Sequence, residues 1–243
     1  MTDPLRPLVD LPGVADAVQT ARDAVDEVHR HPANRRGWGT TAAEASVRAA
    51  RASAAIDGGA TEIPEGGEVE DPVLAGALRV AEVSGALLAT WQRAPLQALA
   101  RLHVLAAADL IDDQDRLGRP RAGTAERLDL LAQLLTGGTT VAGPVLAGVV
   151  HGELLALAPF GTADGVVARA AARLTLIGTG LDPKGLAVPE VSCLRRAEEY
   201  SRLWKGFASG EPEAVGAWLV FCCDTLVAGA REAKSIADAA MED

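Results

Sequence analysis

The chain contains few side chains that could act as general bases, nucleophiles or metal ligands. Of its 243 residues, four are histidines and three are cysteines. His29 and His31 are two residues apart at the end of a predicted helix, whereas helical metal-binding pairs are four apart, so we expect a solvent-exposed helix end there. His151 and Glu153 form the H-x-E of the zinc deaminases, but the P-C-x-x-C segment that completes that zinc site is absent. No metal site is therefore predicted.

The remaining histidine and the cysteines suit an apolar interior. His103 lies in an apolar helical stretch, where we expect a semi-buried, hydrogen-bonded imidazole rather than a base. Cys193, Cys222 and Cys223 are odd in number and include an adjacent pair, unlike the cysteines of a secreted disulfide framework. They also lack partners at a spacing that suits thiolate catalysis or zinc. We expect buried free thiols and a reducing, cytoplasmic location.

Three aspartates, Asp112, Asp113 and Asp115, resemble the aspartate-rich motif of all-α prenyl diphosphate synthases. In that motif, carboxylates hold magnesium against a diphosphate. The reaction needs a second acidic cluster that faces the first, and the sequence has none. The spacing of the aspartates is also compressed. A solvated acidic loop is the favoured interpretation.

Two segments far apart in the sequence carry a more specific signal. Residues 158–169 read Ala-Pro-Phe-Gly-Thr-Ala-Asp-Gly-Val-Val-Ala-Arg and resemble, without a gap, the motif HxFx(D/E)GNGRxxR of the Fic family. Residues 53–58 read Ser-Ala-Ala-Ile-Asp-Gly and resemble the inhibitory motif (S/T)xxxE(G/N) of the class that carries it on an N-terminal helix. Weaker similarities extend the resemblance over residues 40–235: Leu102-His103, Gly118-Arg119-Pro120-Arg121, His151, Tyr200 and Trp218-Leu219-Val220-Phe221.

The resemblance implies a reaction. Fic proteins transfer AMP from ATP to a protein hydroxyl, and the motif histidine accepts the proton of that hydroxyl as it attacks the α-phosphate. The acidic motif residue holds magnesium, while the loop and its arginines hold phosphates. The inhibitory glutamate pairs with the second arginine and blocks the seating of the γ-phosphate.

Several functional positions of the family differ in this chain. Ala158 stands at the place of the base, and Thr162 at the place of the magnesium carboxylate. The first motif glycine, the asparagine and the first arginine are replaced by Ala163, Asp164 and Val166. Because alanine cannot accept a proton, the resemblance implies that AMP transfer is lost and that the chain has no catalytic residue.

The motif residues that are retained are Pro159, Phe160, Gly165 and Arg169. The candidate nucleotide-binding residues are accordingly Thr162, Asp164, Gly165 and Arg169. We expect no cofactor, and ATP with magnesium only if this site is still competent.

Ser53, Asp57 and Gly58 form the inhibitory-like segment. Asp57 keeps the charge of the family's glutamate and is one methylene shorter, so the resemblance implies an ion pair with Arg169 between the N-terminal helix and the motif helix. Two interpretations stay open. The pair is either a relic of autoinhibition or, as we favour, a fixed salt bridge in a site that no longer binds nucleotide.

Three hypotheses about function follow. The first is a degenerate Fic-fold pseudoenzyme that has lost AMP transfer and acts as a binding or regulatory module, with an unidentified protein partner at a flap near Arg119 and Arg121 (residues 116–123). The second is a nucleotide- or phosphate-dependent transferase with altered chemistry, in which Asp164 binds a metal. The third is a structural subunit of an oligomer.

Helical periodicity and helix breakers predict the elements that position these residues. A helix over 13–31 is predicted by apolar positions at helical spacing: Val14, Val18, Ala21, Val25 and Val28. Thr40 or Thr41 is expected to cap a helix that ends at Ile56. Between glycines and prolines, further helices are predicted over 72–93, 95–111, 124–136, 143–157, 165–178, 190–208 and 212–240, with an acidic loop over 60–71.

We therefore predict an all-α, Fic-like helical bundle with a small flap or hairpin. Residues 1–60 are expected to form an N-terminal helical extension that carries the inhibitory-like helix, and residues 61–243 the core domain. Aromatic residues make up only 3% of the chain, which favours packed helices over a β-sandwich or barrel.

The net charge of -10 makes binding to nucleic acid or to an anionic membrane unexpected, because both need a basic surface. The first residues lack the pattern of a signal peptide. No uncharged apolar run approaches the roughly 20 residues that span a bilayer. We expect a cytoplasmic protein that can form a homo-oligomer.

Overall fold

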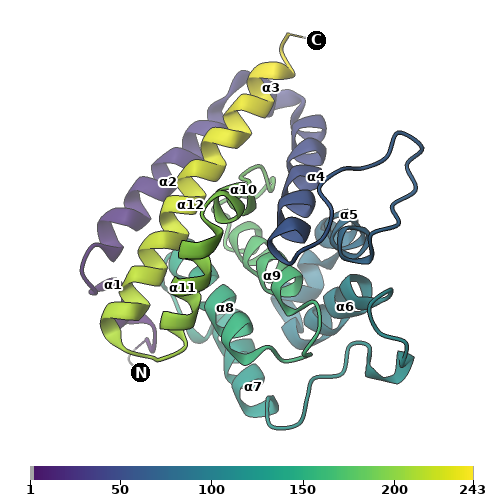
Figure 1. Cartoon of the computed structure of the whole chain (residues 1–243). Coiled ribbons are helices and arrows are strands. Elements are labelled where there is room, and N and C mark those ends of the chain that lie inside the picture. The colour runs from purple at the N-terminus through teal and green to yellow at the C-terminus, as the bar shows by residue number, and fades with distance from the viewer. Residues whose placement is uncertain (1–2, 243) are drawn as a thin grey trace.

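The computed structural model describes residues 3–242, and its elements are helices (Figure 1). Residues 3–242 contain no β-strand, so the predicted all-α class is confirmed. The α-helices are α1 (Arg6–Val9), α2 (Val14–Arg30), α3 (Pro32–Arg36), α4 (Trp38–Ile56), α5 (Pro72–Arg93), α6 (Pro95–Ala107), α7 (Ala125–Gln133), α8 (Gly143–Leu157), α9 (Asp164–Gly178), α10 (Pro189–Arg195), α11 (Ala197–Phe207) and α12 (Pro212–Ala239). Two short elements are the 3-10 turn η1 (Gln114–Arg116) and the π-helical turn η2 (Leu134–Gly138).

Prolines define several helix starts. Pro72, Pro95 and Pro212 lie in the first turns of α5, α6 and α12, where the missing N–H would have had no helical partner. The predicted cap of the second long helix is wrong. α4 begins at Trp38, and Thr41 lies inside the helix with its Oγ1 donating to Asn34 Oδ1 at 2.7 Å.

One predicted helix is divided in two. The segment 190–208 breaks at Arg196, whose φ of -115° and ψ of 36° are not helical, into α10 and α11. No glycine or proline marks this break in the sequence. A kink without a helix breaker is set by tertiary packing, so the sequence pattern could not predict it.

The predicted flap is a loop, not a hairpin. Between α6 and α7 the described chain contains only the 3-10 turn η1 and no strand. Gly118 and Gly123 have φ of 72° and 85°, and Pro120 has no N–H to donate, so the segment turns too often to form a strand ladder. Its backbone joins the motif loop where Arg121 N–H donates to Pro159 O at 2.7 Å.

The motif helix α9 and the preceding α8 form the centre of the bundle (Figure 1). α8 is buried almost all around, from Pro144 through Gly152, and its sequence there is apolar except for His151. α5 and α6 pack closely on the α9 side. A Cβ on Gly76 of α5 would lie 2.2 Å from Ala106 O of α6, so this approach of the two helices requires glycine.

α2 lies alongside α12 (Figure 1). Its buried residues are those that the sequence periodicity predicted: Val14, Val18, Ala21, Val25 and Val28. They belong to the same cluster of buried side chains as α8 and α9. Residues 1–60 and 61–243, which we predicted as an extension and a core domain, therefore share one hydrophobic core in the described chain.

The predicted solvent-exposed helix end at His29 and His31 is wrong. The His29 side chain is 16% exposed, and its Nε2 lies 2.8 Å from Asp182 Oδ1. The His31 side chain is 12% exposed, with Nε2 3.0 Å from Asp238 Oδ1 on α12. His29 therefore ties the end of α2 to the buried Asp182, and His31 ties it to the half-exposed Asp238 of α12.

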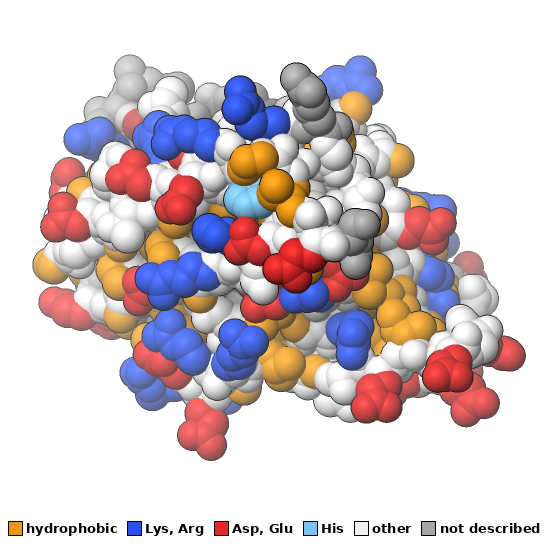
Figure 2. Space-filling model, turned by 90° about the horizontal axis from the view of Figure 1, so that it is seen from above, with side chains coloured by type: hydrophobic (Ala, Val, Ile, Leu, Met, Phe, Trp, Pro, Cys, Tyr) orange, Lys and Arg blue, Asp and Glu red, His pale blue; other side chains and the backbone are white. Residues whose placement is uncertain are grey.

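α5 and α12 are long and apolar enough to cross a membrane by length and composition. A core helix meets the same criterion, and both helices pack within the bundle here. On the face shown in Figure 2, acidic and basic side chains are interspersed.

Candidate functional site

The motif loop, residues 158–163, connects α8 to α9. Phe160 anchors it in the core, with its ring stacked on His103 at 4.1 Å between centroids. Arg121 holds its start by donating from Nη2 to Leu157 O at 3.2 Å and to Ala158 O at 2.6 Å. The loop bends sharply because Ala158 and Ala163 both adopt positive φ, of 43° and 54°. The side chains around it thus hold a tight turn in front of the first turn of α9.

His103 has a positioning role in this loop. It is fully buried rather than semi-buried as predicted, and its Nδ1 accepts the Gly118 N–H at 2.9 Å. Burial lowers its pKa. This neutral imidazole stacks on Phe160 of the motif loop and accepts a hydrogen bond from Gly118 of the flap. His103 therefore connects the motif loop to the flap.

Arg169, on α9, is the hub of the site and is 3% exposed. Its Nε donates to Ser53 Oγ at 2.8 Å, and its Nη2 donates to Ser53 O at 2.9 Å. The same Nη2 lies 2.8 Å from Asp57 Oδ2, so the ion pair predicted between Asp57 and Arg169 is formed. The inhibitory-like segment at the end of α4 therefore occupies most of the guanidinium.

A second polar group supports Arg169 from the other side. Tyr200 OH lies 3.4 Å from Arg169 Nη1 and 2.8 Å from His151 Nε2. Burial, with the charge of Arg169, lowers the pKa of His151 to about 3, so this imidazole is neutral near neutral pH. Burial opposes the charge of Arg169, but Tyr200 and Asp57 raise its pKa, and it stays a cation.

Asp164, at the start of α9, turns back onto the loop. Its Oδ1 accepts the Phe160 N–H at 2.9 Å, and its Oδ2 accepts the Gly161 N–H at 2.7 Å. Burial raises the pKa of this carboxyl, and the two N–H groups act in the opposite direction. The N–H groups of the loop, which could hold a bound anion, thus donate to the carboxylate of Asp164 instead.

Asp57 also covers the first turn of α9. A Cβ on Gly165 would lie 2.5 Å from both Asp57 carboxylate oxygens, so the retained glycine leaves room for this carboxylate. Gly58 has a φ of 85°, which turns the chain away directly after Asp57. The positive end of the α9 dipole therefore faces two acidic side chains, Asp57 and Asp164.

The other predicted residues lie on the same loop or at its edge. Ala158 caps the end of α8, and Thr162 is a partly buried loop residue. Arg119 is exposed and lies 3.8 Å from Asp115. Within residues 3–242, no group of three or more histidine, cysteine or acidic side chains could hold a metal ion.

The sequence indicated the three residues that contact Arg169, and for Asp57 it also predicted the ion pair. Ser53 and Asp57 were marked by the inhibitory-like segment, and Tyr200 by its place in the C-terminal helices. That Arg121 would hold the motif loop and that Asp164 would pair with it had no sequence signal. The Asp164 contacts lie within the loop that the positive-φ residues Ala158 and Ala163 turn back toward α9.

The informative comparison with known proteins is the one with solved structures. No protein-family model matches the sequence, and no curated protein matches it. The structure is similar to the crystal structure of a Fic family protein from Desulfovibrio desulfuricans G20, with a TM-score of 0.73 and 22% sequence identity over 92% of this chain and 74% of that chain. The likeness shows that the chain has the Fic fold, as the motifs predicted.

Proposed function

We propose that this Fic-fold chain does not transfer AMP and acts as a binding or regulatory module. The observation that carries the proposal is the pairing of Arg169 and of the loop N–H groups with acidic side chains of the chain itself. By resemblance to the family, these are the groups that would hold the nucleotide phosphates. A phosphate would have to displace Asp57 and Asp164, or bind beside two negative charges.

The residues at the site do not fit ATP with magnesium. Ala158 offers no base, and loss of a general base costs about 10²–10⁴ in rate. Thr162 replaces a carboxylate ligand with a neutral hydroxyl, which is a poor magnesium ligand. Val166 removes the donor fork of an arginine. We derive no reaction step through nucleotide here.

Calorimetric titration with ATP and magnesium tests the proposal. We expect no saturable heat for the wild type below about 1 mM. In the double variant Asp57→Ala/Asp164→Asn, both charges are removed, and we expect binding at least about tenfold tighter because repulsion of the phosphates is relieved. Asp115→Ala, which removes an exposed acid directly before the flap, is the matched control and should behave as wild type.

Mass spectrometry tests the loss of transfer separately. After incubation with ATP, magnesium and cell lysate, we expect no protein to carry covalent AMP, in the wild type or in Ala158→His. The histidine alone should not restore transfer, because Thr162, Asp164 and Val166 remain. Covalent AMP from the wild type would refute the pseudoenzyme proposal and support a transferase instead.

We place partner binding at the flap, residues 116–123. Arg119 projects into solvent with its side chain 73% exposed, while Arg121 is held to the motif loop. Arg119→Glu should therefore weaken binding of a partner without changing the fold, whereas Arg121→Glu should disturb the loop as well. A cytoplasmic location and self-association are further proposals, and light scattering of the purified protein measures the second.

A further inference from the structure

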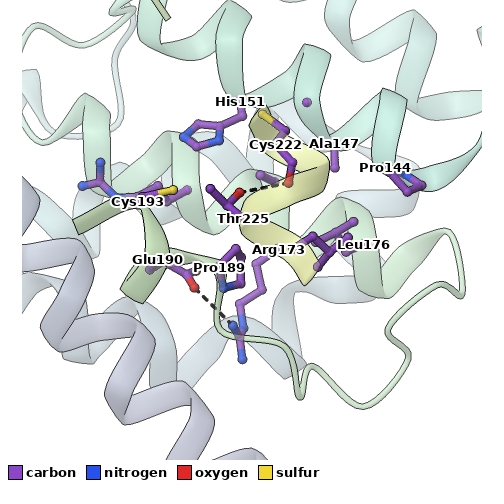
Figure 3. Close-up of a pocket in the computed structure, with 14 residues that line it drawn as sticks. Pro144, Ala147, His151, Arg173, Leu176, Pro189, Glu190, Cys193, Cys222 and Thr225 are labelled. Atoms are coloured by element: carbon purple, nitrogen blue, oxygen red, sulfur yellow. Dashed lines mark hydrogen bonds and ion pairs between the residues drawn. The ribbon is translucent and has the colours of Figure 1, made fainter. Parts of the chain in front are cut away.

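A small cavity and a larger groove lie at different places in the bundle. The cavity, between α8, α9, α10 and α12, has a volume of about 50 Å³ (Figure 3). Polar contacts beside it are made within the chain: Glu190 faces Arg173 in an ion pair at 3.7 Å. The groove has a volume of about 510 Å³ and lies between α1, α7, α8 and the connection from α11 to α12. It differs from the cavity because one of its walls is an N-terminal segment that includes α1.

The wall of this groove is mostly apolar. Leu5 and Leu8 of the N-terminal segment line it, and α7, α8, α11 and α12 contribute leucine, valine and phenylalanine side chains. The charged residues that line it, Arg127 and Glu153, form an ion pair with each other. Leu130 of α7 is 55% exposed even with the segment in place. Movement of the segment would therefore enlarge an apolar surface that already reaches solvent.

Residues 3–12, which we call the strap, have few polar contacts with the rest of the chain. In the described chain, their backbone hydrogen bonds stay within residues 3–14. The ion pair between Arg6 and Asp10, at 4.0 Å, is also internal to the strap. Among the described residues, the hydrogen bonds that connect the strap to the bundle all involve one side chain, that of Asp3.

Asp3 binds the loop before α8 with both carboxylate oxygens. Its Oδ1 accepts the Thr139 hydroxyl at 2.8 Å, and its Oδ2 accepts the N–H and the hydroxyl of Thr140 at 2.6 and 2.8 Å. Oδ1 also accepts the Leu5 N–H at 3.0 Å within the strap. These hydrogen bonds, above all that of the Thr140 N–H, lower the pKa of Asp3, so the carboxylate is ionised near neutral pH. Hydrogen bonds to an ionised acceptor are stronger than those between neutral groups.

The other end of the strap has the features of a hinge. Gly13, directly before α2, has a φ of 78°, and glycine adopts this and other backbone conformations at little cost. Between Asp3 and Gly13 the strap lies beside α12 (Figure 1) and is held by apolar contacts. Leu5 is buried, while Leu8 and Leu11 are only partly buried. A segment with so few large buried side chains opens at a low free energy.

We propose that the strap is a lid on the apolar groove, with Asp3 as its latch and Gly13 as its hinge. Thr140 is exposed, and a negative charge placed there opens the lid, because like charges at hydrogen-bond distance repel. Opening uncovers apolar side chains of α7 and α8. The lid is separate from Arg169 and the motif loop, so this inference goes beyond the proposed function and does not depend on it.

Hydrogen exchange and the neutral dye Nile red test the lid in the full chain. Asp3→Ala removes the latch, so amides of residues 5–11 should exchange at least about tenfold faster than in the wild type. Nile red fluorescence should rise at least about twofold, because the dye reports exposed apolar surface. Thr140→Glu should change both readouts in the same direction, since its carboxylate repels Asp3. Exchange in α9 should stay unchanged in both variants.

Asp10→Ala is the matched control, because it removes an acid of the same strap that is 69% exposed and does not contact the bundle. It should behave as wild type in both measurements. Three outcomes overturn the proposal. Unchanged exchange and dye binding in Asp3→Ala would show that the leucines hold the strap without a latch. An equal rise in Asp10→Ala would mean that any lost acid loosens the segment. Loss of cooperative unfolding in Asp3→Ala and Thr140→Glu would make the strap part of the core rather than a lid.

Discussion

At the residue scale, Ala158 and Ala163 occupy backbone conformations that suit glycine, with φ of 43° and 54°. The left-handed region costs a residue with a Cβ about 1–2 kcal/mol, and the greater unfolded freedom of glycine offsets about 0.5–1 kcal/mol. Ala158→Gly and Ala163→Gly should each raise the free energy of unfolding by up to about 1 kcal/mol. Urea denaturation measures this change.

The matched control is Ala89→Gly, on the exposed side of α5. Glycine in a right-handed helix interior should lower the free energy of unfolding by about 0.5–1 kcal/mol. If all three variants were destabilised equally, the two loop alanines would not be strained.

His151 should make the protein sensitive to acid. Its pKa is lowered from 6.5 to about 3 by burial. Between these values the unfolded chain binds a proton that the folded chain does not, so stability falls as the pH falls, by up to about 1.4 kcal/mol per unit. His151→Gln should show a shallower decline between pH 6 and 4.5 in urea denaturation. Parallel curves for both proteins would mean that His151 is protonated in the folded state.

Residue types predicted part of the site and not the rest. Asp57 and Arg169 could be paired from the sequence because both belong to motifs whose order and spacing are retained. The contacts of Asp164 could not, since the expectation was a residue that faces a phosphate or a metal. Two turns with positive φ, at Ala158 and Ala163, bring its carboxylate back to the Phe160 and Gly161 N–H groups. Such turns could not be predicted from the sequence, because alanine rarely adopts positive φ.

At the scale of elements, α4 packs into the bundle through small side chains. Its buried residues are all small: Thr41, Ala45, Ala49, Ala50, Ala52, Ser53 and Ala54. Ser46 and Ser53 also line a second cavity, against α5 and α9. Few large apolar side chains in an interface mean a low free energy of local opening. The Arg169 contacts to Ser53 and Asp57 are therefore a large part of what holds α4 in place.

Hydrogen exchange detected by mass spectrometry tests this view of α4. Peptides from α4 should exchange faster than those from α8 and α9. In Asp57→Ala, exchange should rise further in α4 and stay unchanged in α12. Equal protection of α4 and α8 would contradict the weak anchoring.

Element boundaries were predictable where local chemistry sets them. The starts at Pro72, Pro95 and Pro212 follow from the ring of proline. The break at Arg196 and the absence of strands in the flap could not be predicted from local chemistry. Packing on α12 sets the first, and contacts with the motif loop set the second. Likewise, the spacing of His29 and His31 argued against a metal-binding pair. It could not predict that these histidines contact Asp182 and Asp238, because both aspartates are far away in the sequence.

At the scale of the whole molecule, α2 is part of the common core rather than an appendage. It buries four valines and one alanine, chiefly against α12. At about 1.5–3 kcal/mol for each of the four valines, this burial is on the order of 6–12 kcal/mol. The total stability of a domain is about 5–15 kcal/mol, so the loss of α2 would remove most of it.

A chain that begins at Trp38 should therefore fail to fold cooperatively. Its thermal denaturation, followed by circular dichroism, should show a broad or absent transition, because α12 would expose the surface that α2 covers. The matched control replaces residues 62–70 of the exposed acidic loop with glycine and serine, which removes charge but little buried surface. It should melt close to the wild type. A sharp transition near the wild-type temperature in the truncated chain would mean that the core is complete without α2 and that the N-terminal helices are a separable extension.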